Sequence, residues 1–160
     1  MTGTIEATTA GLVRDAQILA DKQTEAAERA PVRRFIAELY EHVPPSDLAA
    51  RSPEDLCGAG LALWRFAARR RNGRAMVRVY NPALGRDGWS SPHTIVEIVN
   101  DDMPFLVDSV TASVNAGGRE VRLVIHPVLS VAREETGSLV ALDPPTGGLR
   151  AARSLGGTCS

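Results

Sequence analysis

Apolar residues recur at intervals of three and four through the first half of the chain, and they alternate with polar residues in the second half. From Pro31 the spacing is typical of one face of an amphipathic helix, which carries Val32, Phe35, Ile36, Leu39, Tyr40 and Val43. Pro44 and Pro45 end this run. A second helix is predicted from Pro53 to about Arg71, and its expected buried positions are Leu56, Leu63, Trp64 and Ala67.

The ends of the second helix carry start and stop signals. Ser52 before Pro53, Glu54 and Asp55 resembles a capping arrangement with proline in the first turn. The stretch 69–73, Arg-Arg-Arg-Asn-Gly, places positive charge at the negative end of the helix dipole and ends on a glycine. We interpret these arginines as a solvated helix cap rather than a patch for nucleic acid, because no aromatic residues are interleaved with them.

The residues before Pro31 predict a weaker helix. From Thr8 to about Ala27 the chain is rich in alanine, and Leu12, Ile18 and Leu19 form a thin apolar stripe. Such a helix is marginal by itself and needs a packing partner.

After Ala75 the period becomes that of strands. Strands are predicted at Met76–Tyr80, His93–Val99, Val121–Val131 and Leu139–Leu142, with a helix between the second and third from about Pro104 to Ala116. That helix should turn Val107, Val110, Thr111 and Val114 inward and end at Gly117 and Gly118. Pro127 cannot donate to a sheet, so the third strand should be an edge strand or carry a bulge. Gly137 should turn the chain between the last two strands.

The order β-β-α-β-β is the first half of a ferredoxin-like α/β sandwich, and the expected fold class is α+β. Residues 1–30 should be a weakly helical or disordered N-terminus, and residues 31–74 a helical segment. Residues 75–142 should form the partial α/β domain. Residues 143–160, rich in Pro, Gly, Ser and Arg, should be a disordered tail.

The composition of the chain limits which binding partners and which cellular location we expect. Eighteen basic and nineteen acidic residues leave a formal net charge of −1, so no general field attracts nucleic acid or anionic lipid. No apolar run is long enough to span a bilayer and the chain does not start with a secretory pattern, so we expect a cytoplasmic protein. Cys57 and Cys159 should accordingly be free thiols.

The most distinctive stretch is Asn100–Ser109, where two adjacent carboxylates, Asp101 and Asp102, precede Met103 and Pro104. Carboxylates at the first turn of a helix satisfy free backbone N–H groups and the macrodipole. The stretch therefore predicts an acidic turn that caps the following helix.

Few residues are candidates for a metal, acid/base or nucleotide-binding site. A hard-metal or acid/base site can be imagined from His93, Asp101, Asp102, Asp108 and His126, but capping already explains the carboxylates, and histidines in strands are more often structural. No Gly-x-Gly-x-x-Gly or Walker-type motif is present. We therefore expect no catalytic residue, metal or cofactor in this chain.

A series of motifs carries a family resemblance. It runs from Phe35 to Leu139 through Asp47-Leu48-Ala49, Ser52 to Leu56, Arg69-Arg70-Arg71, Val77 to Pro82, Gly88-Trp89, His93-Thr94, Asp101 to Ser109 and His126-Pro127-Val128. The chain resembles the N-terminal region of the large bacterial NAD-specific glutamate dehydrogenases, a helical segment followed by the first ACT-like domain.

The resemblance implies a parent enzyme that uses NAD to convert L-glutamate to 2-oxoglutarate and ammonia. Its NAD-binding and catalytic residues would lie far downstream, so this chain would have a regulatory or assembly role, with the rest of a homo-oligomeric dehydrogenase as its partner. After about Ala141 the likeness ends, and we expect an N-terminal fragment or truncated product. The alternative is a free-standing module for amino-acid sensing or protein interaction.

ACT-like domains often bind an amino-acid effector where a strand turns into a helix. The matching positions here are Asn100, Asp101, Asp102 and Met103. Backbone N–H groups there could hold the effector carboxylate and an aspartate its ammonium group, although the acidic pair would repel an anionic amino acid. The competing interpretation is capping and contact between domains.

Overall fold

A computed structural model describes residues 2–142 of the chain. Its helices are α1 (Thr2–Asp21), α2 (Ala26–Tyr40), α3 (Pro45–Ala49), α4 (Pro53–Ala67), α5 (Leu84–Asp87) and α6 (Leu106–Ala116). Its strands are β1 (Met76–Tyr80), β2 (Ile95–Val99), β3 (Val131–Arg133) and β4 (Leu139–Leu142). The α+β class predicted from the sequence is confirmed.

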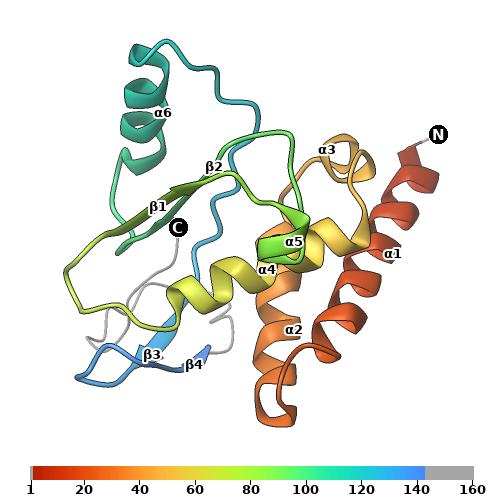
Figure 1. Cartoon of the computed structure of the whole chain (residues 1–160), viewed down its shortest axis with the longest axis horizontal. Helices are drawn as coiled ribbons and strands as arrows, with labels where there is room; N and C mark the ends of the chain where they lie inside the picture. The colour runs from red at the N-terminus through yellow and green to blue at the C-terminus, as the bar shows by residue number, and fades with distance from the viewer. Residues whose placement is uncertain (1, 143–160) are drawn as a thin grey trace.

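The helices α1, α2 and α4 pack against one another and form most of the core (Figure 1). The apolar face predicted for the residues after Pro31 is buried in α2, and α1 contributes Ala16 and Ala20. Phe35 meets Trp64 of α4 with ring centroids 5.4 Å apart. The N-terminal stripe thus finds its packing partner in α2 and α4.

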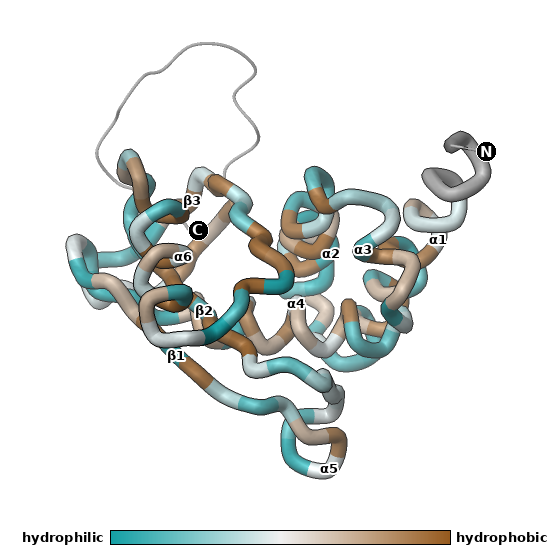
Figure 2. The backbone as a smooth tube through the Cα atoms, turned by 90° about the horizontal axis from the view of Figure 1, so that it is seen from above, coloured by the Kyte–Doolittle hydropathy of each residue, from teal (hydrophilic) through white to brown (hydrophobic). Residues whose placement is uncertain are grey.

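Helix α4 lies in the middle of the molecule, with α1 and α2 on one side and the strands with α6 on the other (Figure 2). Its start is the predicted one, because the Ser52 hydroxyl accepts from the backbone N–H of Asp55 at 3.1 Å and Pro53 occupies the first turn. The Tyr40 hydroxyl donates to the Leu56 carbonyl at 2.8 Å, and this bond connects α2 to α4. Helix α4 therefore connects the helical core to β1, whose Arg78 donates to the Ala62 carbonyl of α4.

Strands β1 and β2 form an antiparallel pair in which Arg78 lies opposite Glu97 and Val79 opposite Val96. Alternation gives this pair two unlike faces. The inner face, toward α4, carries Met76, Arg78, Tyr80, Ile95, Glu97 and Val99. The outer face carries Val77, Val79, Val96 and Ile98.

Strands β3 and β4 form a separate antiparallel pair, so the described strands make two two-stranded sheets. The turn between them contains Gly137 with φ of 87°, as the sequence predicted. The Arg70 N–H donates to the Gly137 carbonyl at 2.9 Å, and a Cβ at Gly137 would lie 2.5 Å from the Arg70 carbonyl oxygen. Glycine is required there both for backbone conformation and for space.

The prediction of a strand over Val121–Val131 is wrong for most of its length, since regular pairing begins only at Val131. Residues 121–129 keep a strand-like alternation of burial, with Leu123, Ile125, Pro127 and Leu129 more buried than the residues between them. The pattern is present, but no strand of the described residues pairs with it. Pro127 has no N–H to donate to such a ladder.

The predicted start of the last helix is also wrong. Helix α6 begins at Leu106 rather than Pro104, and its cap position is Phe105 in the left-handed region with φ of 61°. No side chain caps it, so Asp101 and Asp102 do not act as helix caps. Its predicted inward positions are only half-buried. Helix α6 projects away from the helical core (Figure 1).

Three further expectations concern the C-terminal tail, the cysteines and membrane spans. The tail predicted for residues 143–160 lies outside the described residues, as does Cys159. Cys57 is a buried free thiol. None of the helices within residues 2–142 combines the length and the apolar character needed to cross a lipid bilayer.

Candidate functional site

The acidic turn is tied to the end of α4 through a buried arginine. The Arg70 side chain is 0% exposed; its Nη2 pairs with Asp101, and its Nη1 donates to the Arg74 carbonyl at 3.1 Å. The prediction that Arg69, Arg70 and Arg71 form a solvated helix cap is therefore wrong for Arg70, because α4 ends at Ala67 and the chain then turns inward. Asp101 neutralises a buried cation.

The other residues proposed for effector binding lie at the surface. Asp102 is exposed, and Met103 is half exposed. The Asn100 side-chain amide contacts the Met103 sulfur at 3.2 Å. Of these four residues, only Asp101 contacts a buried polar group within the described part of the chain. That group is the Arg70 guanidinium, and the contact serves the fold. Effector binding by Asn100, Asp101, Asp102 and Met103 stays a prediction.

The imagined metal or acid/base cluster does not assemble. Within residues 2–142 no three or more His, Cys, Asp and Glu side chains come together as a metal site would require. His93, His126 and Asp108 are exposed.

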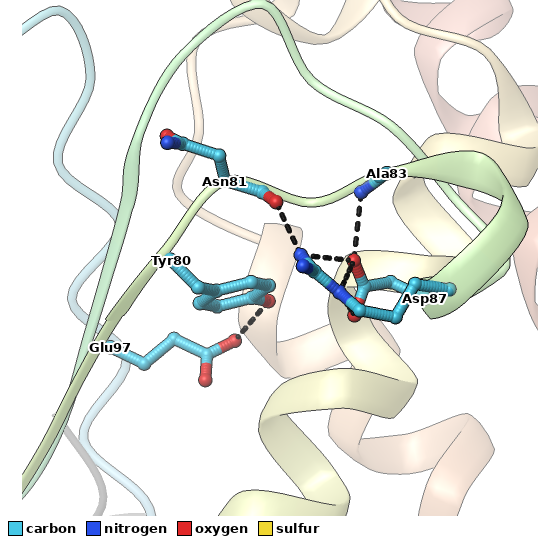
Figure 3. A network of polar contacts seen from close by, with 6 residues as sticks. Tyr80, Asn81, Ala83, Asp87 and Glu97 are labelled. Atoms are coloured by element: carbon cyan, nitrogen blue, oxygen red, sulfur yellow. Dashed lines mark hydrogen bonds and ion pairs between the residues drawn. The ribbon is translucent and has the colours of Figure 1, made fainter.

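A polar network that the sequence reading missed lies on the inner face of β1 and β2. Glu97, 7% exposed, accepts from Nε of Arg78 at 2.7 Å. It also accepts from the Tyr80 hydroxyl at 2.9 Å (Figure 3). The Arg78 guanidinium lies 4.6 Å from the ring centroids of both Phe66 and Tyr80. Its Nη2 also donates to the Ala62 carbonyl at 3.1 Å, which fixes β1 against α4. The register of the predicted strands could have revealed the Arg78–Glu97 pair.

The loop after β1 supplies a second arginine. Arg86 on α5 donates from Nη2 to the Asn81 carbonyl at 2.6 Å and to Asp87 at 2.9 Å, and Asp87 also accepts from the Ala83 N–H at 2.7 Å (Figure 3). The adjacent guanidinium holds the pKa of Asp87 below its usual value, with the Ala83 bond as the next cause. Burial, followed by the nearby Glu97 charge, raises the pKa of Tyr80, so its hydroxyl keeps its proton.

These groups border an open pocket of about 540 Å³ between α4, the end of β1 and α5. It is lined by Arg65, Arg78, Arg86, Asp87 and the rings of Tyr80 and Trp89. Trp89 packs closely on α4. If Gly58 carried a Cβ, that atom would lie 2.3 Å from the Cβ of Trp89. Gly58 therefore permits the close approach of Trp89 to α4, and this neighbour could not be identified from the spacing of residues in the sequence.

The outer face of β1 and β2 is the second unusual surface. Val77 and Val79 are each 61% exposed, and Val96 is 43% exposed. In the part of the chain that the structure describes, β1 and β2 each have one neighbouring strand, so each also has an open edge. An apolar face of this kind is typical of a surface that another protein segment covers.

Comparison with known proteins adds the following. Residues 35–154 match the family described as glutamate dehydrogenase, ACT1 domain. The chain is 39% identical over 116 residues to a NAD-specific glutamate dehydrogenase of Halomonas elongata, and 37% identical over 113 residues to one of Pseudomonas aeruginosa. These matches cover 72% and 71% of this chain and 7% of each relative. No solved structure shows a significant match.

Proposed function

Because this chain belongs to the glutamate dehydrogenase ACT1-domain family, we propose that it acts as a non-catalytic regulatory and assembly domain of a cytoplasmic NAD-specific glutamate dehydrogenase. The chain spans about 7% of the length of the curated relatives it matches. In this proposal the oxidative deamination of L-glutamate with NAD is performed elsewhere in that enzyme, and the partner of this chain is the rest of the dehydrogenase.

The observation that carries the assembly role is the outer face of β1 and β2. Four β-branched apolar side chains lie there, namely Val77, Val79, Val96 and Ile98. Exposed apolar surface is costly at about 25 cal/mol per Å², so a face of this composition gains most by packing against another apolar surface. The enzymes named as relatives are far longer than this chain, and their remaining length supports dehydrogenase sequence as the occupant of this face.

The half-buried face of α6 supports the same role. Leu106, Val107, Val110 and Val114 are neither buried nor fully exposed, and no residue of α6 is buried. A helix with one apolar face that is not covered acquires most of its stability from packing. We expect α6 and the outer face of β1 and β2 to be covered together in the assembled enzyme.

The experiment attaches an affinity tag to this chain in the cells that make it and measures NAD-dependent glutamate oxidation per tagged chain. We expect the activity to be recovered with the tag. Val79→Asp should lower the recovered activity several-fold, because it places a charge on the apolar outer face. Val140→Asp is the matched control, since Val140 in β4 is also 61% exposed but lies on the other sheet, and it should leave the activity unchanged.

Two results would contradict the proposal. Recovery of the tagged chain without dehydrogenase activity would favour the free-standing module. An equal effect of both substitutions would show that the outer face of β1 and β2 has no special part in assembly.

A further inference from the structure

The pocket between α4, β1 and α5 concentrates positive charge. Arg65, Arg78 and Arg86 reach it from three different elements, and Asp87 is the one carboxylate in its lining. Glu97 lies behind the lining and is paired with Arg78 and Tyr80. The lining therefore has an excess of guanidinium groups over carboxylates, which favours an anion in the pocket.

The guanidinium groups still have donors to offer. Arg78 uses Nε and Nη2 on Glu97 and Ala62, and Arg86 uses Nε and Nη2 on Asp87 and Asn81. Within residues 2–142, Nη1 of both arginines and the whole guanidinium of Arg65 donate to no protein atom. Guanidinium donors bind carboxylate and phosphate oxygens more strongly than neutral donors do.

Two of these arginines are already held in place. Arg78 lies between the rings of Phe66 and Tyr80 and is bonded to Glu97 and the Ala62 carbonyl. Arg86 is bonded to Asp87 and the Asn81 carbonyl (Figure 3). Because their side chains are ordered before any ligand arrives, less entropy is lost when an anion binds.

The same pocket is lined by a tryptophan with an unused donor. Trp89 is 2% exposed, and its indole Nε1 is buried with no acceptor within the described residues. Leaving a buried N–H without a partner is costly, so such groups usually serve a ligand, a water or a strained site. The Trp89 N–H is a second observation that points to a ligand, separate from the charge of the arginines.

From these observations we infer that the pocket bordered by Arg65, Arg78, Arg86 and Trp89 is a binding site for a small oxyanion that carries two negative charges. The ligand class is a short dicarboxylate or a phosphate group, because both present several oxygens to separate guanidinium groups. A volume of about 540 Å³ suits a metabolite-sized molecule. This site is distinct from the acidic turn, and it stands on the pocket geometry whether or not the proposed assembly role holds.

The test is isothermal titration calorimetry on the full chain at low ionic strength, with succinate, inorganic phosphate and butyrate as probes. We expect saturable binding of one succinate or one phosphate per chain, at least tenfold tighter than binding of the monoanion butyrate. Binding by succinate alone would identify a dicarboxylate site, and binding by phosphate alone a phosphoryl site. The affinity should fall as salt is added.

Arg65→Gln is the informative variant, because Arg65 is exposed and makes no hydrogen bond whose loss would unfold the chain. It should weaken binding at least tenfold, whereas Arg119→Gln, an exposed arginine outside the pocket, should change affinity less than twofold. Trp89 fluorescence should respond to the ligand, and Trp89→Phe should remove that response. Absence of saturable binding by both dianions, or equal losses in the two arginine variants, would overturn the inference. Neither result affects recovery of dehydrogenase activity with the tagged chain.

Discussion

At the scale of single residues, the Arg70 guanidinium gives the acidic turn a structural role. A fully buried cation needs a counter-charge, and Asp101 supplies it from a loop thirty-one positions away in the chain. The second carboxylate of the pair, Asp102, has no such task. The two adjacent aspartates, which look equivalent in the sequence, therefore differ in what their loss would cost.

We predict that Asp101→Asn lowers the free energy of unfolding by about 1–3 kcal/mol, because it leaves the buried Arg70 charge without its partner. The value lies below that of a fully buried pair because Asp101 is 47% exposed. Asp102→Asn is the control and should change stability by less than about 0.5 kcal/mol. Urea unfolding followed by circular dichroism measures both. Equal effects of the two substitutions would contradict the pairing.

Cys57 gives a prediction with a defined pH window. Burial raises the pKa of its thiol from 9.0 to about 11. As the pH rises above 9, the unfolded chain releases this proton before the folded chain does, so stability is complete below about pH 9 and falls toward pH 11. The loss should be about 2 kcal/mol at pH 11 and approach about 3 kcal/mol above it, since the two pKa values differ by about two units and one unit corresponds to about 1.4 kcal/mol.

The measurement is the free energy of unfolding at several pH values between 8 and 11, for the natural chain and for Cys57→Ala. The tyrosine hydroxyls with raised pKa contribute a fall of the same sign above pH 10 in both proteins. The Cys57→Ala curve should therefore be flatter by the thiol contribution. Parallel curves would show that the thiol does not titrate differently in the folded chain.

At the scale of elements, contact between α4 and the loop before β2 depends on Gly58. A Cβ there would lie 2.3 Å from Cβ of Trp89, an atom that cannot move without its backbone. We predict that Gly58→Ala destabilises the chain by about 1–3 kcal/mol, although alanine is the better helix former. Gly11→Ala in α1, with no atom within 4 Å of the new Cβ, should stabilise it by about 0.5–1 kcal/mol. Thermal unfolding of both variants checks the opposite signs.

Elements governed by local signals could be predicted from the sequence. Ser52 starts α4, strand β1 has its predicted bounds, and Gly137 turns the last hairpin, because each depends on neighbours within a few residues. The extended segment before Val131 has the alternation of a strand but not the partner, and pairing depends on distant residues. The same limit applies to Arg70, whose burial depends on where the chain goes after α4.

The candidate site could likewise be predicted only where its signals are local in the sequence. The sequence drew attention to Asn100–Met103, where charge and helix signals coincide locally. It missed Arg65, Arg78, Arg86 and Trp89, which come from separate elements and meet only when β1 packs on α4. The cross-strand pairing of Arg78 and Glu97 was the one clue to that site that the two predicted strands offered.

At the scale of the whole molecule, the helices supply most of the buried core and the strands supply little of it. Helices α1, α2 and α4 supply most of the buried side chains, whereas the outer face of β1 and β2 and one face of α6 are left open. This asymmetry fits a domain whose open strand and helix faces are covered by a larger protein. It supports the proposed role of the chain in a dehydrogenase assembly.

The most direct measurement is immunodepletion. Antibodies raised against this chain are used to remove it from an extract of the cells that make it, and NAD-dependent glutamate oxidation is then assayed in the pellet and the supernatant. The account predicts that the activity leaves the supernatant in proportion to the chain and is recovered in the pellet. Complete removal of the chain with the activity left in the supernatant would contradict it.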